Sequence, residues 1–147
     1  MRAILLAALM TLVGCVEHRV GPARTADDYD RKARTTASAA ISAVETVRFL
    51  AELSSAGDSL ATFTSVSVSE QEDALAAIRS DFESIQPPGS PSDEVRSQLV
   101  GLLDAAMEHV ATVRIAARRG QLGELADIGA PLADDSAALN SFLQALS

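Results

Sequence analysis

Apolar and polar residues follow a helical period over most of the chain beyond residue 26. After Asp27, apolar residues recur at alternating steps of four and three, which places them along one side of an α-helix. Gly57 is the expected end of this helix, because glycine readily adopts the left-handed conformation that closes helices. The apolar stripe consists of Ala33, Ala37, Ala40, Val44, Val47 and Ala51.

The pattern of residues 69–86 predicts a second, shorter helix. Ser69 and Glu72 have the spacing of a capping box, in which each side chain bonds the backbone amide of the other residue. Pro87, Pro88 and Gly89 end this segment, because proline lacks an amide donor and disfavours helix in the residue before it. Its apolar face is formed by Leu75, Ile78, Phe82 and Ile85.

A third helix is expected from Ser90, as the N-cap, with Pro91 at the first helical position. It carries the most regular stripe in the sequence, and Gly120 is its expected end. The stripe consists of Val95, Leu99, Leu102, Ala106, Val110, Val113 and Ala117.

The last segment carries leucines on one side, interrupted by Pro131. A proline inside a helical pattern kinks or breaks the helix, so we expect a break near residues 128–130. The leucines are Leu122, Leu125, Leu132, Leu139, Leu143 and Leu146.

Residues 58–68 show neither a helical nor a strand period, and we interpret them as a connection. The helix before them is nearly apolar all round, with Phe49 about 160° from the centre of its stripe and Leu53 on a flank. Either the connection covers this back face through Phe63, or the face docks a partner. We expect the connection to bury Phe49.

Four amphipathic segments and no strand pattern predict a small antiparallel all-α helical bundle over residues 27–147. Composition agrees, because aromatic residues make up 3% of the chain and alanine, a strong helix former, is frequent. The formal net charge of −8 and the absence of a basic stripe argue against nucleic acid as a partner.

The N-terminus has the features of an export signal. Arg2 precedes an uncharged run, Ala3 to Val13, which is too short to span a bilayer as a helix. The chain has one cysteine, Cys15, so it forms no internal disulfide.

The sequence Leu12-Val13-Gly14-Cys15 resembles the lipobox of bacterial lipoproteins. The resemblance covers only residues 1–15. It implies that residues 1–14 are a removable signal peptide and that acyl chains on Cys15 anchor the chain to a membrane of the cell envelope. The domain would then lie outside the cytoplasm, with residues 15–26 as lipidated cysteine and tether.

No motif indicates a metal, a cofactor or catalysis. The chain lacks Glu-x-x-His pairs, a Cys-x-x-Cys-His sequence and a Gly-x-Ser-x-Gly elbow. Met107 and His109 lie about 200° apart on one helix, so they cannot share a site. We expect His109 at the boundary between the apolar and polar faces of its helix, and we expect the pair Asp134 and Asp135 to be in solvent.

These observations favour a non-catalytic bundle that binds another envelope component, such as a protein or a wall polymer. A carrier that holds a small lipid or apolar ligand in its interior is the alternative, because many alanine positions leave room for one.

Overall fold

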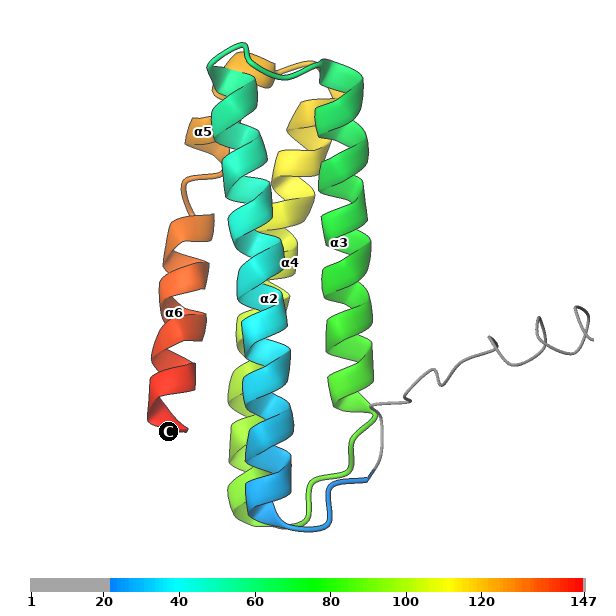
Figure 1. Cartoon of the computed structure of the whole chain (residues 1–147), viewed down its shortest axis with the longest axis vertical. Helices are drawn as coiled ribbons and strands as arrows, with labels where there is room; N and C mark the ends of the chain where they lie inside the picture. Colours follow the sequence, from blue (N-terminus) through cyan, green and yellow to red (C-terminus); the bar gives the residue numbers. More distant parts are fainter. Residues whose placement is uncertain (1–21, 147) are drawn as a thin grey trace, which may run out of the picture.

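The computed structural model describes residues 22–146, and these form an antiparallel all-α bundle, as predicted (Figure 1). Three long helices are followed by a short 3₁₀ turn, a single α-turn and a fourth helix. In chain order the elements are α2 (Ala26–Ser55), α3 (Ala61–Glu83), α4 (Ser90–Arg118), η2 (Leu122–Glu124), α5 (Leu125–Ile128) and α6 (Leu132–Ala145).

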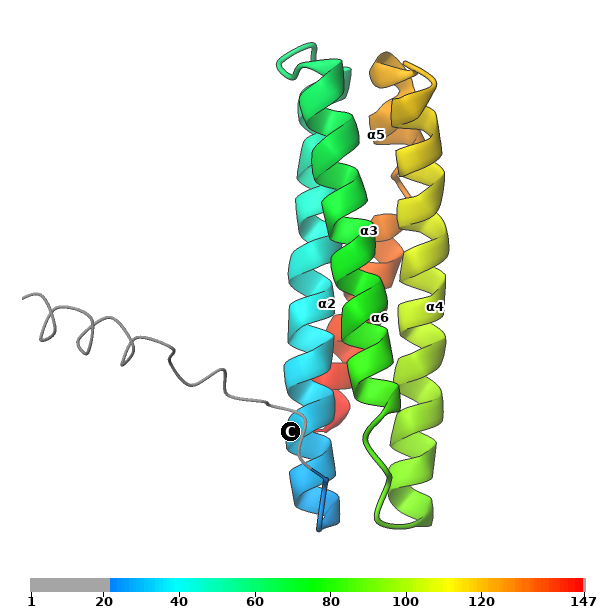
Figure 2. The ribbon, with the colours of Figure 1, turned by 90° about the vertical axis from the view of Figure 1, so that its right-hand side faces the viewer.

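Helix α2 is the centre of the bundle. It packs against α3, α4, α5 and α6, and α3 and α6 lie on opposite sides of it (Figure 1). Successive long helices run antiparallel, so α2 and α4 point the same way and also contact each other (Figures 1 and 2). The described part of the chain enters at one end of the bundle, and the α2–α3 turn lies at the other end.

Residues next to α2 in the sequence cap both of its ends. The Thr25 hydroxyl accepts a hydrogen bond from the Asp28 amide at 3.2 Å, and acidic residues occupy the first turn, where the helix dipole favours them. At the other end, Gly57 has φ +83° and its amide donates to the Ser54 carbonyl, while the Asp58 amide donates to the Leu53 carbonyl. This is the Schellman arrangement that a glycine after a helix predicts.

The apolar stripe expected on α2 forms the core of the bundle. All six of its residues are buried, and they face a row of buried residues on α4. At the end where the chain enters, the rings of Tyr29 and Phe82 meet with their centroids 5.5 Å apart. Burial raises the pKa of the Tyr29 hydroxyl, because the charged form would lose its hydration.

The predicted connection at residues 58–68 is wrong, and so is the capping box at Ser69. Helix α3 begins at Ala61, and Ser69 lies inside it, where its hydroxyl donates to the Ser65 carbonyl at 3.0 Å. Ser, Thr and Val have weak helix propensity, but burial of Thr64 and Val68 in line with the later core residues of α3 overrides it.

The third stripe is correct in outline but shifted at one position. Leu103 is fully buried, whereas Leu102 is only partly buried. The expected break in the last segment is confirmed between α5 and α6. A Cβ at Gly129 would lie 3.4 Å from a Val113 methyl group on α4 and 3.6 Å from the Ala51 Cβ on α2, so the chain passes the bundle closely where it breaks.

We predict that Leu103→Ala lowers the free energy of unfolding by about 2–5 kcal/mol, because it leaves a cavity in the core. Leu102→Ala should cost clearly less, since that side chain already contacts solvent. Urea denaturation monitored by circular dichroism would measure both values. Equal costs, or a larger cost for Leu102, would contradict the assignment of Leu103 to the core.

Candidate functional site

Four large apolar side chains are exposed around the α2–α3 turn. Phe49 is 59% exposed, Leu60 79%, Phe63 56% and Val66 52%. They come from the last third of α2, the turn and the first turns of α3, which meet at one end of the bundle (Figure 1). We call these four residues the hairpin-tip patch. Exposed apolar side chains that gather in one place indicate an interaction surface.

The expectation that Phe49 is buried under Phe63 is therefore wrong. Residues 61–83 run as a helix antiparallel to α2, instead of folding across the back of α2. A helix that directs Thr64 to the core directs the residues one before it and two after it outward. Phe63 and Val66 are therefore exposed, and Leu53 is half-buried beside them.

Hydroxyl groups hold the tip in place from inside. The Thr64 hydroxyl lies 2.7 Å from the Ser54 hydroxyl and 2.8 Å from that of Ser59, and the Ser54 hydroxyl also donates to the Leu50 carbonyl at 2.8 Å. Ser54 and Thr64 are buried, so these bonds satisfy groups that would otherwise be costly to bury. The patch therefore rests on a fixed backbone.

The patch is far from the point where the described chain begins. α2 has 30 residues, which corresponds to a length of about 45 Å at 1.5 Å per residue. Residue 22 lies near the start of α2, and the turn that carries Leu60 lies beyond its other end (Figure 1). The long axis of the bundle thus separates the two features.

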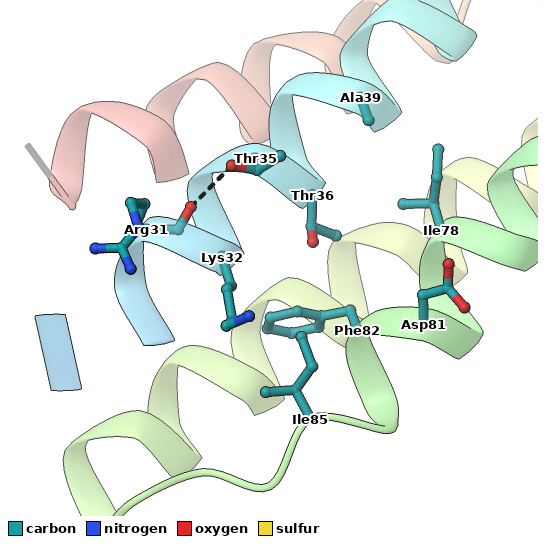
Figure 3. A pocket seen from close by; sticks show the side chains of 9 residues that line it. All are labelled: Arg31, Lys32, Thr35, Thr36, Ala39, Ile78, Asp81, Phe82 and Ile85. Atoms are coloured by element: carbon teal, nitrogen blue, oxygen red, sulfur yellow. Dashed lines mark hydrogen bonds between the residues drawn. The ribbon is translucent and has the colours of Figure 1, made fainter. Parts of the chain in front are cut away.

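A groove of about 370 Å³ lies between α2 and α3 at the end where the chain enters (Figure 3). Arg31, Lys32 and Thr36 line it from α2, and Phe82 and Ile85 line it from α3 and the residues just after it. Phe82 is 1% exposed and Ile85 is 7% exposed, because the bundle itself covers them. Ala39 and Ile78 also line the groove and are less buried, so its lining combines accessible apolar groups with the side chains of Arg31 and Lys32.

His109 and Asp135 form a contact that the sequence did not predict. The His109 Nδ1 atom lies 2.7 Å from an Asp135 carboxylate oxygen and joins α4 to α6. Asp135 is 8% exposed, so the expectation that it is solvated like Asp134 is wrong, and His109 is half-buried. Nothing in the local sequence signals this pair, because its two residues are distant along the chain.

Helix α6 is tied to α2 by further polar contacts. An Arg34 guanidinium nitrogen donates to the Leu146 carbonyl at 2.7 Å. A hydrogen bond from Ser136, helped by Arg48, lowers the pKa of the Glu45 carboxyl. Together with the contact between α4 and α6, these interactions hold α6 against the bundle. We therefore interpret these polar residues as structural.

Within residues 22–146, no group of three or more His, Cys, Asp or Glu side chains is placed to hold a metal ion. In the same range, no helix combines the length and apolarity needed to cross a membrane. The lipobox residues Leu12, Val13 and Gly14, the predicted lipidation site Cys15 and residues 16–21 of the tether lie outside the described residues.

Comparison with known proteins adds no assignment. No protein-family profile, curated protein or solved structure matches the chain. The hairpin-tip patch is therefore the candidate site on physical grounds alone.

We predict that His109→Ala lowers the free energy of unfolding by about 1–3 kcal/mol, because it leaves the buried Asp135 carboxylate without its histidine partner. Asp134→Ala is the matched control, since the neighbouring carboxylate is exposed and should change stability by only about 0.5 kcal/mol. Thermal and urea denaturation would measure both. A His109→Ala protein as stable as wild type would show that the contact adds nothing.

Proposed function

We propose that the protein is an envelope lipoprotein, anchored to a membrane through acyl chains on Cys15, whose bundle is a non-catalytic binding module. The hairpin-tip patch is its binding surface, and a protein of the envelope is its partner. The observation that carries this proposal is the exposure of Phe49, Leu60, Phe63 and Val66 on a rigid tip.

The distance between the patch and the start of α2 supports this arrangement. An anchor at Cys15 would tie the start of α2 to the membrane through ten residues, 16–25, which span at most about 33 Å. The patch begins at Phe49, 23 residues after Ala26, so it would then stand about 35–45 Å farther out along the bundle. A surface in that position is suited to a component beyond the headgroups.

The chemistry of the patch favours a protein partner over a charged polymer. Aromatic and branched aliphatic side chains provide much of the binding energy in protein interfaces. None of the four patch residues is charged, and the net charge of −8 opposes any polyanion. We therefore place the partner among proteins.

The carrier function has less support. The groove between α2 and α3 is open to solvent, and two of its apolar residues, Phe82 and Ile85, are almost fully buried by the bundle (Figure 3). A site for an acyl chain needs a concave apolar surface that buries most of the ligand. The exposed patch carries more apolar surface than this groove, so we do not propose the carrier.

We predict that Cys15→Ser moves the protein from the detergent phase to the aqueous phase, or leaves an uncleaved precursor. Two or three acyl chains anchor a protein firmly, whereas their loss removes that contribution entirely. Labelled palmitate should incorporate into the wild-type protein alone. Equal labelling of the two proteins would refute the lipoprotein assignment.

We predict that Phe49→Ala unfolds within about 1 kcal/mol of wild type, because the ring is 59% exposed, yet loses crosslinked protein in intact envelopes. Ile115→Ala is the matched control, since Ile115 is 41% exposed and lies on α4, at the same end of the bundle but outside the four patch residues. Mass spectrometry of crosslinked material would identify what is captured. Unchanged capture by Phe49→Ala would remove the patch as the binding surface.

A further inference from the structure

We infer that the protein partner at the hairpin-tip patch presents a basic amphipathic helix. Its apolar face covers the patch, and lysine or arginine side chains beside that face meet the carboxylates around the patch. This inference rests on the proposed function, because it gives the chemistry of the partner for the same surface. It follows from the carboxylates that border the patch on three sides and from the two-helix shape of the surface.

The hairpin that carries the patch is acidic over its outer half. Residues 45–73 contain six carboxylates and one basic residue, Arg48. Two of the carboxylates form close ion pairs: Glu45 lies 2.8 Å from Arg48, and Glu72 pairs with Arg114 on α4. The other four are exposed, and we call them the acidic border. They are Glu52, Asp58, Glu70 and Asp73.

Two residues of the acidic border follow the patch along α3. Glu70 comes seven residues after Phe63, and Asp73 comes seven residues after Val66. Seven residues are nearly two helical turns, so each carboxylate lies on the same side of α3 as its apolar residue, about 10 Å farther along. Neither side chain has an ion pair or a hydrogen bond within residues 22–146.

The other two residues of the acidic border lie at the turn and on α2. Asp58 comes two residues before Leu60, and its side chain has no partner in the part of the chain that the structure describes. Glu52 comes three residues after Phe49, on the side of α2 that faces α5. It lies 3.8 Å from Arg48, so it is the one carboxylate of the border with a nearby cation among the described residues.

The fourth side of the patch, toward α4, is not acidic. There an Arg118 guanidinium nitrogen donates to the Ser69 hydroxyl at 3.2 Å, and the Glu72 carboxylate is compensated by Arg114. The charge around the patch is therefore directional. We expect the partner to lie across α2 and α3, where the border is acidic, and to leave the side toward α4 uncovered.

The unpaired carboxylates select a basic partner. A partner with acidic groups beside its apolar face would place like charges opposite Asp58, Glu70 and Asp73, which costs free energy. A second copy of the chain would bring the same carboxylates and is disfavoured for this reason. Lysine or arginine would instead form charge-assisted hydrogen bonds with them. Opposite charge also speeds the approach to a molecule of net charge −8.

The shape of the surface favours a helix as the occupant. Near the tip, α2 and α3 run side by side, and each contributes an exposed phenylalanine (Figures 1 and 2). A helix laid along the line between two helices packs its apolar face against both of them, through residues at steps of three and four. Basic residues on its two flanks would then lie near the carboxylates of α2 and of α3.

The test uses the full chain, purified in a neutral detergent, with a photo-crosslinking amino acid at position 49. The probe is a synthetic helical peptide of leucine and lysine, with the leucines at steps of three and four. One control peptide has glutamate in place of every lysine, and a second has the composition of the probe in an order without a helical period. The probe should crosslink at least about tenfold more than either control, because it alone combines the apolar face with complementary charge.

Reversing one charge of the acidic border should reverse this preference. Glu70→Lys should lower crosslinking of the leucine–lysine peptide by at least about fivefold and raise that of the leucine–glutamate peptide. Asp81→Lys is the matched control, since it makes the same change at an exposed position of α3 that lies 18 residues, or about 27 Å, beyond Phe63. It should leave both yields nearly unchanged. Circular dichroism would verify that both variants keep the wild-type helix content.

Salt provides a readout that loss of structure would not reproduce. Raising the ionic strength from about 0.05 M to about 0.5 M should weaken capture of the leucine–lysine peptide, because it screens the attraction between lysine and the carboxylates. Capture that stays constant or increases with salt would show that apolar contact alone holds the peptide, and would overturn the inference.

The outcomes separate this inference from the proposed function. Equal capture of the two amphipathic peptides would overturn the basic partner while leaving the patch as a binding surface. An equal loss of capture in Glu70→Lys and Asp81→Lys would remove the role of the acidic border. If position 49 captures neither a peptide nor any protein of intact envelopes, both the inference and the proposed function fail.

Discussion

The fold depends on one continuous stripe of small and branched apolar residues on α2. Ala33, Ala37 and Ala40 are fully buried, and small side chains allow neighbouring helices to approach closely. Every other described helix packs against α2, so its stripe sets the positions of α3, α4 and α6 together. Helices of this kind gain most of their stability from packing of the apolar face, not from intrinsic propensity. A large residue within the stripe would push α3, α4 and α6 away from α2.

The fold class was predictable from sequence wherever aliphatic residues form the core. Alanine and valine at steps of three and four define α2, and glycine or proline lies near the ends of the long helices. The start of α3 could not be predicted in this way, because Thr64 and Val68 occupy its core positions. Threonine counts as polar in a hydrophobicity pattern, yet here its hydroxyl bonds to Ser54 and Ser59 inside the bundle. A threonine in register with later apolar residues was the available signal.

The candidate site followed only in part from the sequence. Phe49 was recognised as the residue that breaks the amphipathic pattern of α2, but its exposure depended on how α3 runs beside it. The His109–Asp135 pair was not foreseen at all, because it forms between helices far apart in the chain. Local periodicity describes single helices, whereas sites of this kind arise from the way helices pack.

The length of α2 also makes the bundle a spacer. With Cys15 at the membrane as proposed, the height of the patch is set by the number of helical turns between Thr25 and Gly57, at about 5.4 Å per turn. Removing about seven residues at one level from each of α2, α3 and α4 would keep the apolar stripes nearly in register and lower the tip by about 10 Å. The distance of the tip from the start of α2 is therefore encoded separately from the chemistry of the tip.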